Sequence, residues 1–375
     1  MSEETDRSKA ALAMSGGGYR ATLFHVGALT RLNELGYLAK IERISCVSGG
    51  AITAGVLAHA WPSLTWKDDV AADFLDSIER PLREFCKRTI DTKAVGWGAL
   101  LPGVTIGDVL ADIYDEHLGF GGKTLQDLVS RPQFVFNATN LLTGRRVHIE
   151  KRRLSDYTIG IIPDPHVRLA TAVAASSAFP PILSPVVIET ELQAWKKVAG
   201  AIYHGDPHFC EKLCLTDGGA YDNLGLESVD GFETVIVSDA GAPFSVAGEA
   251  SSLWHEQAMR ALDIATDQAR GLRKRLLWTQ VALAQTQVGG RPKRAAYAGI
   301  DGNPCDFPAD TKLKVDPARV APLARLRTRL NTFSDEEQGM LINWGYVLTD
   351  VALRSRIDGG LPPAERWPDP SYPLG

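Results

Sequence analysis

The sequence lacks a long apolar run. None of its 375 residues belongs to an uninterrupted stretch of about 18 apolar residues, the length that would span a bilayer. The first ten residues, MSEETDRSKA, are polar and acidic, which is not typical of a secretory signal peptide. We therefore expect a cytoplasmic protein that meets any lipid from the aqueous side of a membrane.

The sequence also lacks an excess of basic residues. The chain has 40 Lys and Arg against 45 Asp and Glu, a net charge of −5, so we expect no nucleic-acid partner. The five cysteines are an odd number in a long chain, which favours reduced thiols over a disulfide framework. Four potential metal ligands cluster in one segment at a spacing that is not typical of zinc motifs, which favours a surface hairpin there over a zinc site: His204, His208, Cys210 and Cys214.

Strands and helices alternate at the start of the chain. The apolar segment Ala11–Met14 predicts a buried strand, and the residues after the next glycines recur at helical spacing until Gly36. Ile41–Val47 predicts a second strand, followed by a Ser-Gly-Gly turn and the helix Ala51–Ala60. This order predicts a parallel sheet with functional turns at the carboxyl ends of its strands.

Further elements follow in the middle of the chain. We expect two strands joined near Thr143 and Gly144, a small-residue helix that ends at Pro180, and a strand over Glu233–Gly241. Lys67–Asp91 predicts a charged amphipathic helical stretch.

Two regions leave alternatives open. Ala94–Val104 is Gly-rich and apolar, which favours a buried connector over a lid or membrane-facing loop. From Leu253 the pattern is mainly helical, with a capping box at Ser334 and Glu337. Four basic residues are expected on a solvated helix face there, with binding to anionic lipid as the alternative: Arg270, Arg273, Lys274 and Arg275.

Three consecutive glycines, Gly16 to Gly18, form the first candidate site. Successive backbone N–H groups at the start of a helix bind anions. A P-loop would need a Gly-Lys-Ser/Thr sequence, and a dinucleotide site would need an acidic residue at the end of the next strand; neither is present. The third use is an oxyanion hole, which needs a nucleophile nearby.

Ser48 and Asp217 are the candidates that complete such a site. Ser48 follows a predicted strand, as the serine of a G-x-S-x-G nucleophile elbow does, although Cys46 stands where the first glycine is expected. Asp217 ends a predicted strand and precedes two glycines. A structural Asx turn is its alternative role, which Asp222 or Asn223 could equally fill.

Taken in this order, the three features resemble the patatin-like phospholipase family. That family carries a Gly-rich oxyanion loop, a G-x-S-x-G serine and a D-G-[AG] aspartate, and SGGGYRA also resembles the loop of the related cytosolic phospholipases. NATNLLTG (Asn137–Gly144) and AASSAFPPI (Ala174–Ile182) are similar to family segments. The resemblance runs from about Leu12 to Gly241 and implies a three-layer α/β/α fold with a mainly parallel central sheet.

The resemblance also implies a domain organisation and roles for residues. The chain would be a single domain over residues 1–375, with a catalytic core at about 8–245 and a helical C-terminal extension at about 250–360. Ser48 would be the nucleophile, and a buried Asp217 beside it the base, without histidine. Gly16, Gly17, Gly18 and Gly49 would form the oxyanion hole, with the N–H groups of Gly17 and Gly18 as its main donors.

Arg20 has two expected roles. It would either contact the phosphate of a lipid head group, or form an ion pair with an acid of the following helix. A Ser-His-Asp triad would need a well-placed histidine. Four histidines in predicted helices or strands have no obvious partner, and we expect structural roles for them: His25, His59, His148 and His166.

The resulting prediction is a serine lipid acyl hydrolase, of phospholipase A or lysophospholipase type. It would act without a cofactor or metal, on a phospholipid or another acyl-ester lipid, in transient contact with a membrane surface. Two alternatives stay open. One is an esterase, thioesterase or acyltransferase on another acyl donor; the other is a catalytically weak module that binds a lipid or a nucleotide.

Overall fold

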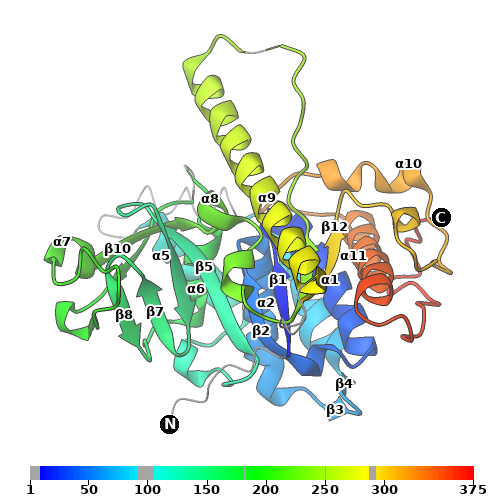
Figure 1. Ribbon diagram of the computed structural model, residues 1–375, viewed down its shortest axis with the longest axis horizontal. Coiled ribbons are helices and arrows are strands. Elements are labelled where there is room, and N and C mark those ends of the chain that lie inside the picture. The colour runs from blue at the N-terminus through cyan, green and yellow to red at the C-terminus, as the bar shows by residue number, and fades with distance from the viewer. Residues whose placement is uncertain (1–8, 91–104, 181–182, 250, 287–292) are drawn as a thin grey trace.

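A computed structural model describes residues 9–90, 105–180, 183–249, 251–286 and 293–375 (Figure 1). Within these residues, ten strands form one sheet in the order β12-β11-β1-β2-β5-β6-β7-β8, with β10 on β5 and β9 on β10. The strands are β1 (Ala10–Met14), β2 (Ile41–Cys46), β5 (Gln133–Asn140), β6 (Arg145–Glu150), β7 (Arg153–Asp156), β8 (Gly160–Pro163), β9 (Val186–Glu189), β10 (Lys212–Asp217), β11 (Thr234–Asp239) and β12 (Arg294–Gly299).

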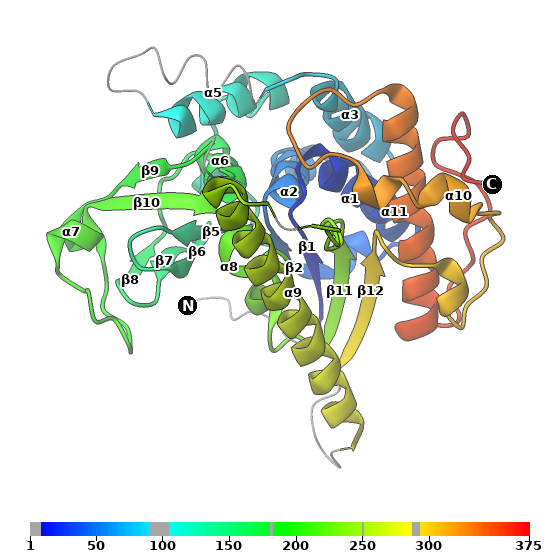
Figure 2. The same ribbon diagram turned by 90° about the horizontal axis from the view of Figure 1, so that it is seen from above.

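Helices cover both faces of this sheet. The helices of the described residues are α1 (Gly18–Glu34), α2 (Gly49–Ala60), α3 (Arg80–Cys86), α5 (Ile106–Leu118), α6 (Leu169–Ser177), α7 (Pro207–Cys210), α8 (Gly219–Asp222), α9 (Trp254–Thr286), α10 (Pro317–Val320) and α11 (Asp335–Arg356). In Figure 2, α1, α2 and α11 lie on one side of β1 and α9 lies on the other. Leu12 and Met14 of β1 pack in the larger core with α1, α2 and α11, whereas Ala11 and Ala13 pack in the core that Leu277 of α9 completes. The predicted three-layer α/β/α architecture is confirmed.

The pairing of the strands brings two distant segments together. Strands β12, β11, β1, β2 and β5 are parallel, as predicted for the central sheet, and the strands beyond β5 pair in antiparallel fashion. The first half of β5 pairs with β2, up to Cys46 opposite Phe136, and its second half pairs with β10, up to Asp217 opposite Ala138. Because β2 and β10 run toward each other along β5, their carboxyl ends meet there.

One expectation about secondary structure is wrong, and a second region, mainly helical as predicted, contains a strand as well. Lys67–Asp91 is helical only in part, because Asp68 and Asp69 adopt positive φ angles in the turn between β3 (Trp66–Lys67) and β4 (Val70–Ala71). The mainly helical region after Leu253 also contains β12, which extends the sheet beside β11. Ala94–Val104, expected as a connector or lid, lies outside the described residues.

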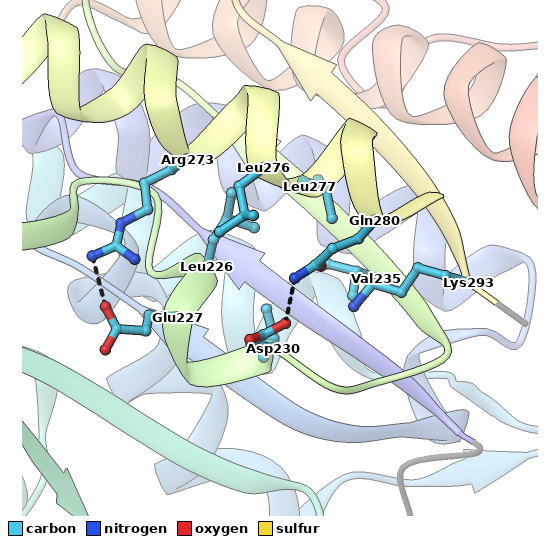
Figure 3. Close-up of a pocket in the computed structure, with 10 residues that line it drawn as sticks. Leu226, Glu227, Asp230, Val235, Arg273, Leu276, Leu277, Gln280 and Lys293 are labelled. Atoms are coloured by element: carbon cyan, nitrogen blue, oxygen red, sulfur yellow. Dashed lines mark hydrogen bonds and ion pairs between the residues drawn. The ribbon is translucent and has the colours of Figure 1, made fainter. Parts of the chain in front are cut away.

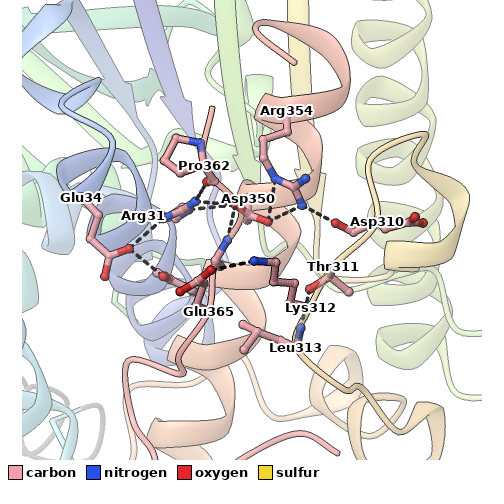
Figure 4. A network of polar contacts seen from close by, with 12 residues as sticks. Arg31, Glu34, Asp310, Thr311, Lys312, Leu313, Asp350, Arg354, Pro362 and Glu365 are labelled. Atoms are coloured by element: carbon pink, nitrogen blue, oxygen red, sulfur yellow. Dashed lines mark hydrogen bonds and ion pairs between the residues drawn. The ribbon is translucent and has the colours of Figure 1, made fainter. Parts of the chain in front are cut away.

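Helix α11 is tied to α1 over much of its length. It begins with the predicted capping box, in which Ser334 and Glu337 exchange hydrogen bonds. Small residues allow close packing, since a Cβ on Gly27 would lie 2.8 Å from the Tyr346 backbone nitrogen. Asp350 lies fully buried between two guanidinium groups and forms ion pairs of 2.7 Å with Arg31 and Arg354 (Figure 4). Both charges of Arg31 and Asp350 are satisfied by this network, as buried charges require.

Helix α9 lies across the sheet and continues past its edge. Near its C-terminal end it packs on the 3₁₀ helix η6 (Leu226–Val229), where Arg273 forms an ion pair of 2.6 Å with Glu227 and Gln280 donates to Asp230 (Figure 3). At the carboxyl end of β11, Asp239 pairs with Arg270 at 2.5 Å. Arg270 is buried, so the expectation that it belongs to a solvated basic face is wrong.

The N-terminal half of α9 projects beyond the rest of the fold (Figure 1). We call residues 254–269 the arm. All of its residues are exposed or half-buried, and at its end the side chain of Trp254 is 80% exposed. The arm extends about 24 Å beyond Arg270, at 1.5 Å per residue. No helix in the described part of the chain combines the length and the apolar character needed to cross a membrane.

Candidate active site

Ser48 occupies a sharp turn between β2 and α2. Its backbone has φ 53° and ψ −118°, a conformation that non-glycine residues rarely adopt and that is typical of strained functional positions. The turn is closely packed, since a Cβ on Gly49 would lie 3.1 Å from Cβ of Ala21, and one on Gly50 would lie 2.6 Å from the Met14 carbonyl oxygen. The predicted strand–turn–helix context of a nucleophile elbow is therefore present around Ser48.

The end of α6 holds the turns of Ser48 and Asp217 in place. The Ser48 N–H donates to the backbone oxygen of Ser176 at 3.1 Å and also approaches its Oγ at 3.2 Å. The same backbone oxygen accepts from Gly218 N–H at 3.3 Å, and the Ala178 oxygen accepts from Asp217 N–H at 2.9 Å. Two turns that are far apart in the sequence are thus fixed by two residues of a third segment, Ser176 and Ala178.

The Asp217 carboxylate is buried and only partly hydrogen-bonded. Its Oδ1 accepts from Gly219 N–H at 2.7 Å, whereas its Oδ2 has no hydrogen-bond partner among the described residues. Burial raises the pKa of Asp217 to about 6, and the Gly219 N–H and the nearby Ser48 hydroxyl oppose this rise. The two side chains are therefore neighbours, although no hydrogen bond of ordinary geometry joins the Ser48 hydroxyl to the carboxylate.

The glycines of the candidate oxyanion hole differ in their availability. The Gly16 N–H donates to the Asn223 backbone oxygen at 3.0 Å and is therefore already engaged. Among the described residues, no hydrogen bond uses the N–H groups of Gly17, Gly18 or Gly49. Gly17 and Gly18 have φ angles of 145° and 58°, which favour glycine. Gly16 is thus a structural member of the loop, and the other three glycines keep donors free for a ligand.

Arg20 does not form the expected ion pair with an acid of α1. The side chain is 1% exposed and turns inward from the first turn of α1. Its Nη2 donates to the Ala240 oxygen at 2.9 Å, and its Nη1 donates to the Leu326 oxygen at 2.5 Å, with no ion pair to an acid of α1. Burial lowers the pKa of Arg20 to about 10. Arg20 joins α1, β11 and the segment before α11 behind the glycine loop.

Cys46, the residue that departs from the elbow motif, lies wholly inside the sheet. Its Sγ donates to the Val135 oxygen at 3.2 Å, and Asn137 Nδ2 donates to the Cys46 oxygen at 3.0 Å. Ser176 Oγ donates in turn to the Asn137 oxygen at 2.7 Å. The sequence motifs assign no role to Asn137 or Ser176, although both lie in the segments that are similar to the family, NATNLLTG and AASSAFPPI.

The histidines nearest the site have structural roles. His25 is fully buried, 2.7 Å from Ser238 Oγ and 2.9 Å from the Ser15 oxygen, and burial lowers its pKa to about 4. His148 is likewise enclosed and contacts Ser228 Oγ at 3.0 Å. Across the described ranges, no group of three or more His, Cys, Asp and Glu side chains is placed to hold a metal ion, and all five cysteines are unpaired.

Comparisons with known proteins identify the family and the fold of this chain. The family model of patatin-like phospholipases matches residues 12–230. The structure is similar to human GIVD cytosolic phospholipase A2, with a TM-score of 0.55, 14% identity and coverage of 93% of this chain and 60% of that one. The complex of that enzyme with methyl gamma-linolenyl fluorophosphonate gives a TM-score of 0.50, 14% identity and coverage of 92% and 58%. No curated protein sequence matches the chain.

Proposed function

The chain belongs to the patatin-like phospholipase family of lipid-hydrolysing enzymes, and from this premise we propose that it is a serine lipid acyl hydrolase with a Ser48–Asp217 dyad. One observation carries the proposal. A buried carboxylate with a pKa raised to about 6 has an oxygen without a partner beside a serine in a strained turn. Carboxylates are costly to bury unpaired, and such an arrangement is typical of catalytic sites.

Acylation would begin with attack of Ser48 Oγ on the carbonyl carbon of an ester. Asp217 Oδ2 would accept the hydroxyl proton and pass it to the leaving alcohol as the ester C–O bond breaks. The negative charge on the carbonyl oxygen would be stabilised by the free N–H groups of Gly17, Gly18 and Gly49. Loss of one such donor typically costs about 3 kcal/mol of transition-state stabilisation.

The acyl donor we propose is a phospholipid or a related acyl-ester lipid. The family assignment supports this class, and the human enzyme similar in fold has been solved with a linolenyl fluorophosphonate. The chain spans about 60% of the length of that enzyme. A shared fold does not imply a shared substrate range, so the substrates of this chain are to be measured on this chain. An esterase, thioesterase or acyltransferase working on another acyl donor through the same two residues is the alternative.

Mass spectrometry of products from mixed phospholipid vesicles tests this function. Wild-type protein is expected to release free fatty acid and lysophospholipid, and a Ser48→Ala preparation serves as the blank. A series of synthetic esters and thioesters of increasing chain length separates the alternatives. A preference for short chains or thioesters, with no release from vesicles, would contradict the lipid assignment.

We also propose that the arm brings the enzyme to its substrate at a membrane surface. Arg270 anchors α9 to Asp239 at the carboxyl edge of the sheet, the edge that carries Ser48, and the arm continues outward from there. Its first residue, Trp254, is 80% exposed, and Leu253, which directly precedes the arm, is 51% exposed. Exposed apolar groups of this size, tryptophan above all, favour the boundary between water and lipid.

Replacing Leu253 and Trp254 together by serine is therefore expected to weaken binding to phosphatidylcholine vesicles about tenfold or more, since burial of one large apolar side chain contributes 1.5–3 kcal/mol. Cosedimentation measures the binding. Ile202→Ser is the matched control, because Ile202 is 74% exposed but lies outside the arm. Hydrolysis of a soluble short-chain ester should stay unchanged in both variants. Equal vesicle binding by the arm variant and the wild type would remove the arm from the proposal.

A further inference from the structure

Asn223 is enclosed by glycines that border the candidate dyad. A Cβ on Gly219 would lie 2.6 Å from Asn223 Oδ1 and 3.0 Å from Asp217 Oδ1, so the two side chains border the same space in front of Gly219. On the other side, a Cβ on Gly16 would collide with Asn223 Oδ1 and lie 3.0 Å from Cβ of Ser48. The Nδ2 group faces Gly241, where a Cβ would lie 3.0 Å away. Because Gly16, Gly219 and Gly241 have no side chains, the carboxamide of Asn223 fits beside Ser48 and Asp217.

The carboxamide of Asn223 is held by packing and not by hydrogen bonds. Among the described residues its side chain has no hydrogen-bond partner, whereas its backbone oxygen accepts from Gly16 N–H at 3.0 Å. The residue is half-buried and therefore reachable by a small molecule. Asp217 Oδ2 lacks a partner too, so two acceptors on neighbouring residues flank Ser48. Half-buried polar groups without protein partners generally bind water.

We infer that Asn223 positions the water molecule that hydrolyses the acyl-enzyme. This inference rests on the proposed function, because it requires an acyl group on Ser48. A water molecule has two O–H donors, and the site offers it two acceptors, Asp217 Oδ2 and Asn223 Oδ1. With both donors engaged, a lone pair of the water oxygen is left to face the acyl carbon.

The hydrolytic step balances with these groups alone. The water oxygen bonds to the acyl carbon while Asp217 Oδ2 takes one proton from it, and the free N–H groups of the glycine loop stabilise the oxyanion. The bond between the acyl carbon and Ser48 Oγ then breaks, and Asp217 returns the proton to that oxygen. Free carboxylic acid and Ser48 with its hydroxyl are the products. Asn223 exchanges no proton and fixes the direction of attack.

Rapid-mixing kinetics with a p-nitrophenyl ester test this role, because the first product reports acylation and the steady state reports deacylation. Asn223→Leu keeps the branching of the side chain at Cγ, with a larger volume, and removes both polar atoms. We expect its burst rate to stay near that of the wild type and its steady-state rate to fall roughly tenfold to a hundredfold, the usual effect of misplacing a reactant. Intact-protein mass spectrometry should then find acylated Ser48, and hydroxylamine, a stronger nucleophile than water, should restore turnover.

Asp230→Asn provides the matched control, since Asp230 is exposed and lies further along the same loop. Equal losses of burst and steady-state rates in Asn223→Leu would indicate a merely structural residue and overturn the inference, as would an unchanged steady-state rate. The burst itself shows that the variant is folded. If the wild type gives neither a burst nor labelling of Ser48 by a fluorophosphonate, the proposed function fails instead.

Discussion

Ser48→Ala is expected to lower the hydrolysis of phospholipid vesicles and of p-nitrophenyl esters by a factor on the order of 10³ or more, as for other serine nucleophiles. The reason is that alanine cannot form the acyl-enzyme, and the glycine N–H groups alone leave only residual catalysis. Labelling by a fluorophosphonate probe should disappear with the activity. Both are measured on protein whose unfolding midpoint has been checked, so that loss of chemistry is separated from loss of fold.

The same position offers a control for strain. Because Ser48 has a φ of 53°, Ser48→Gly should relieve an unfavourable backbone conformation and raise the free energy of unfolding by about 1 kcal/mol relative to Ser48→Ala. Both variants should be inactive. An alanine variant that keeps full activity on vesicles would refute the nucleophile assignment, and a glycine variant less stable than the alanine variant would contradict the account of the turn.

The parts of the site that the sequence predicts are those with local causes. A short apolar strand that stops at glycines places Gly17 and Gly18 at the start of α1, and the same pattern places Ser48 at the start of α2. Parallel strands then bring both turns to one edge of the sheet. The capping box of Ser334 is equally local, since both partners lie in one helical turn.

Contacts across the fold could not be predicted in this way. Asp217 lies at the end of β10, which brings it near Ser48 because β10 is antiparallel to β5. The periodicity of the sequence does not indicate whether two strands pair in parallel or antiparallel fashion. Arg20 and Arg270 look like surface cations by composition, yet each is buried because carbonyl or carboxylate groups distant in sequence accept its N–H groups. The enclosure of Asn223 depends on three glycines from three different segments.

Asp217→Asn is expected to lower kcat/KM about 10³-fold, the middle of the range for loss of a general base. The substitution keeps the shape of the side chain and the oxygen that accepts from Gly219 N–H, but the amide cannot take the Ser48 proton. In the wild type the base must be ionised, so kcat/KM should rise with pH and level off above a pKa of about 6. Full activity of the variant at pH 8 would exclude Asp217 as the base.

The same substitution should stabilise the fold in a way that depends on pH. The pKa of Asp217 is about 6 in the folded chain against 3.8 for the free group, so the folded state binds this proton more tightly than the unfolded state. Ionisation of Asp217 in the folded state therefore lowers the free energy of unfolding. This loss is absent below pH 4 and complete above pH 6, where it is about 3 kcal/mol at about 1.36 kcal/mol per pKa unit. Asp217→Asn should remove this loss. Denaturant unfolding at pH 8 should find the variant more stable than the wild type, and the difference should vanish at pH 4; a variant less stable at pH 8 would mean that the carboxylate supports the fold and is not a buried charge held for catalysis.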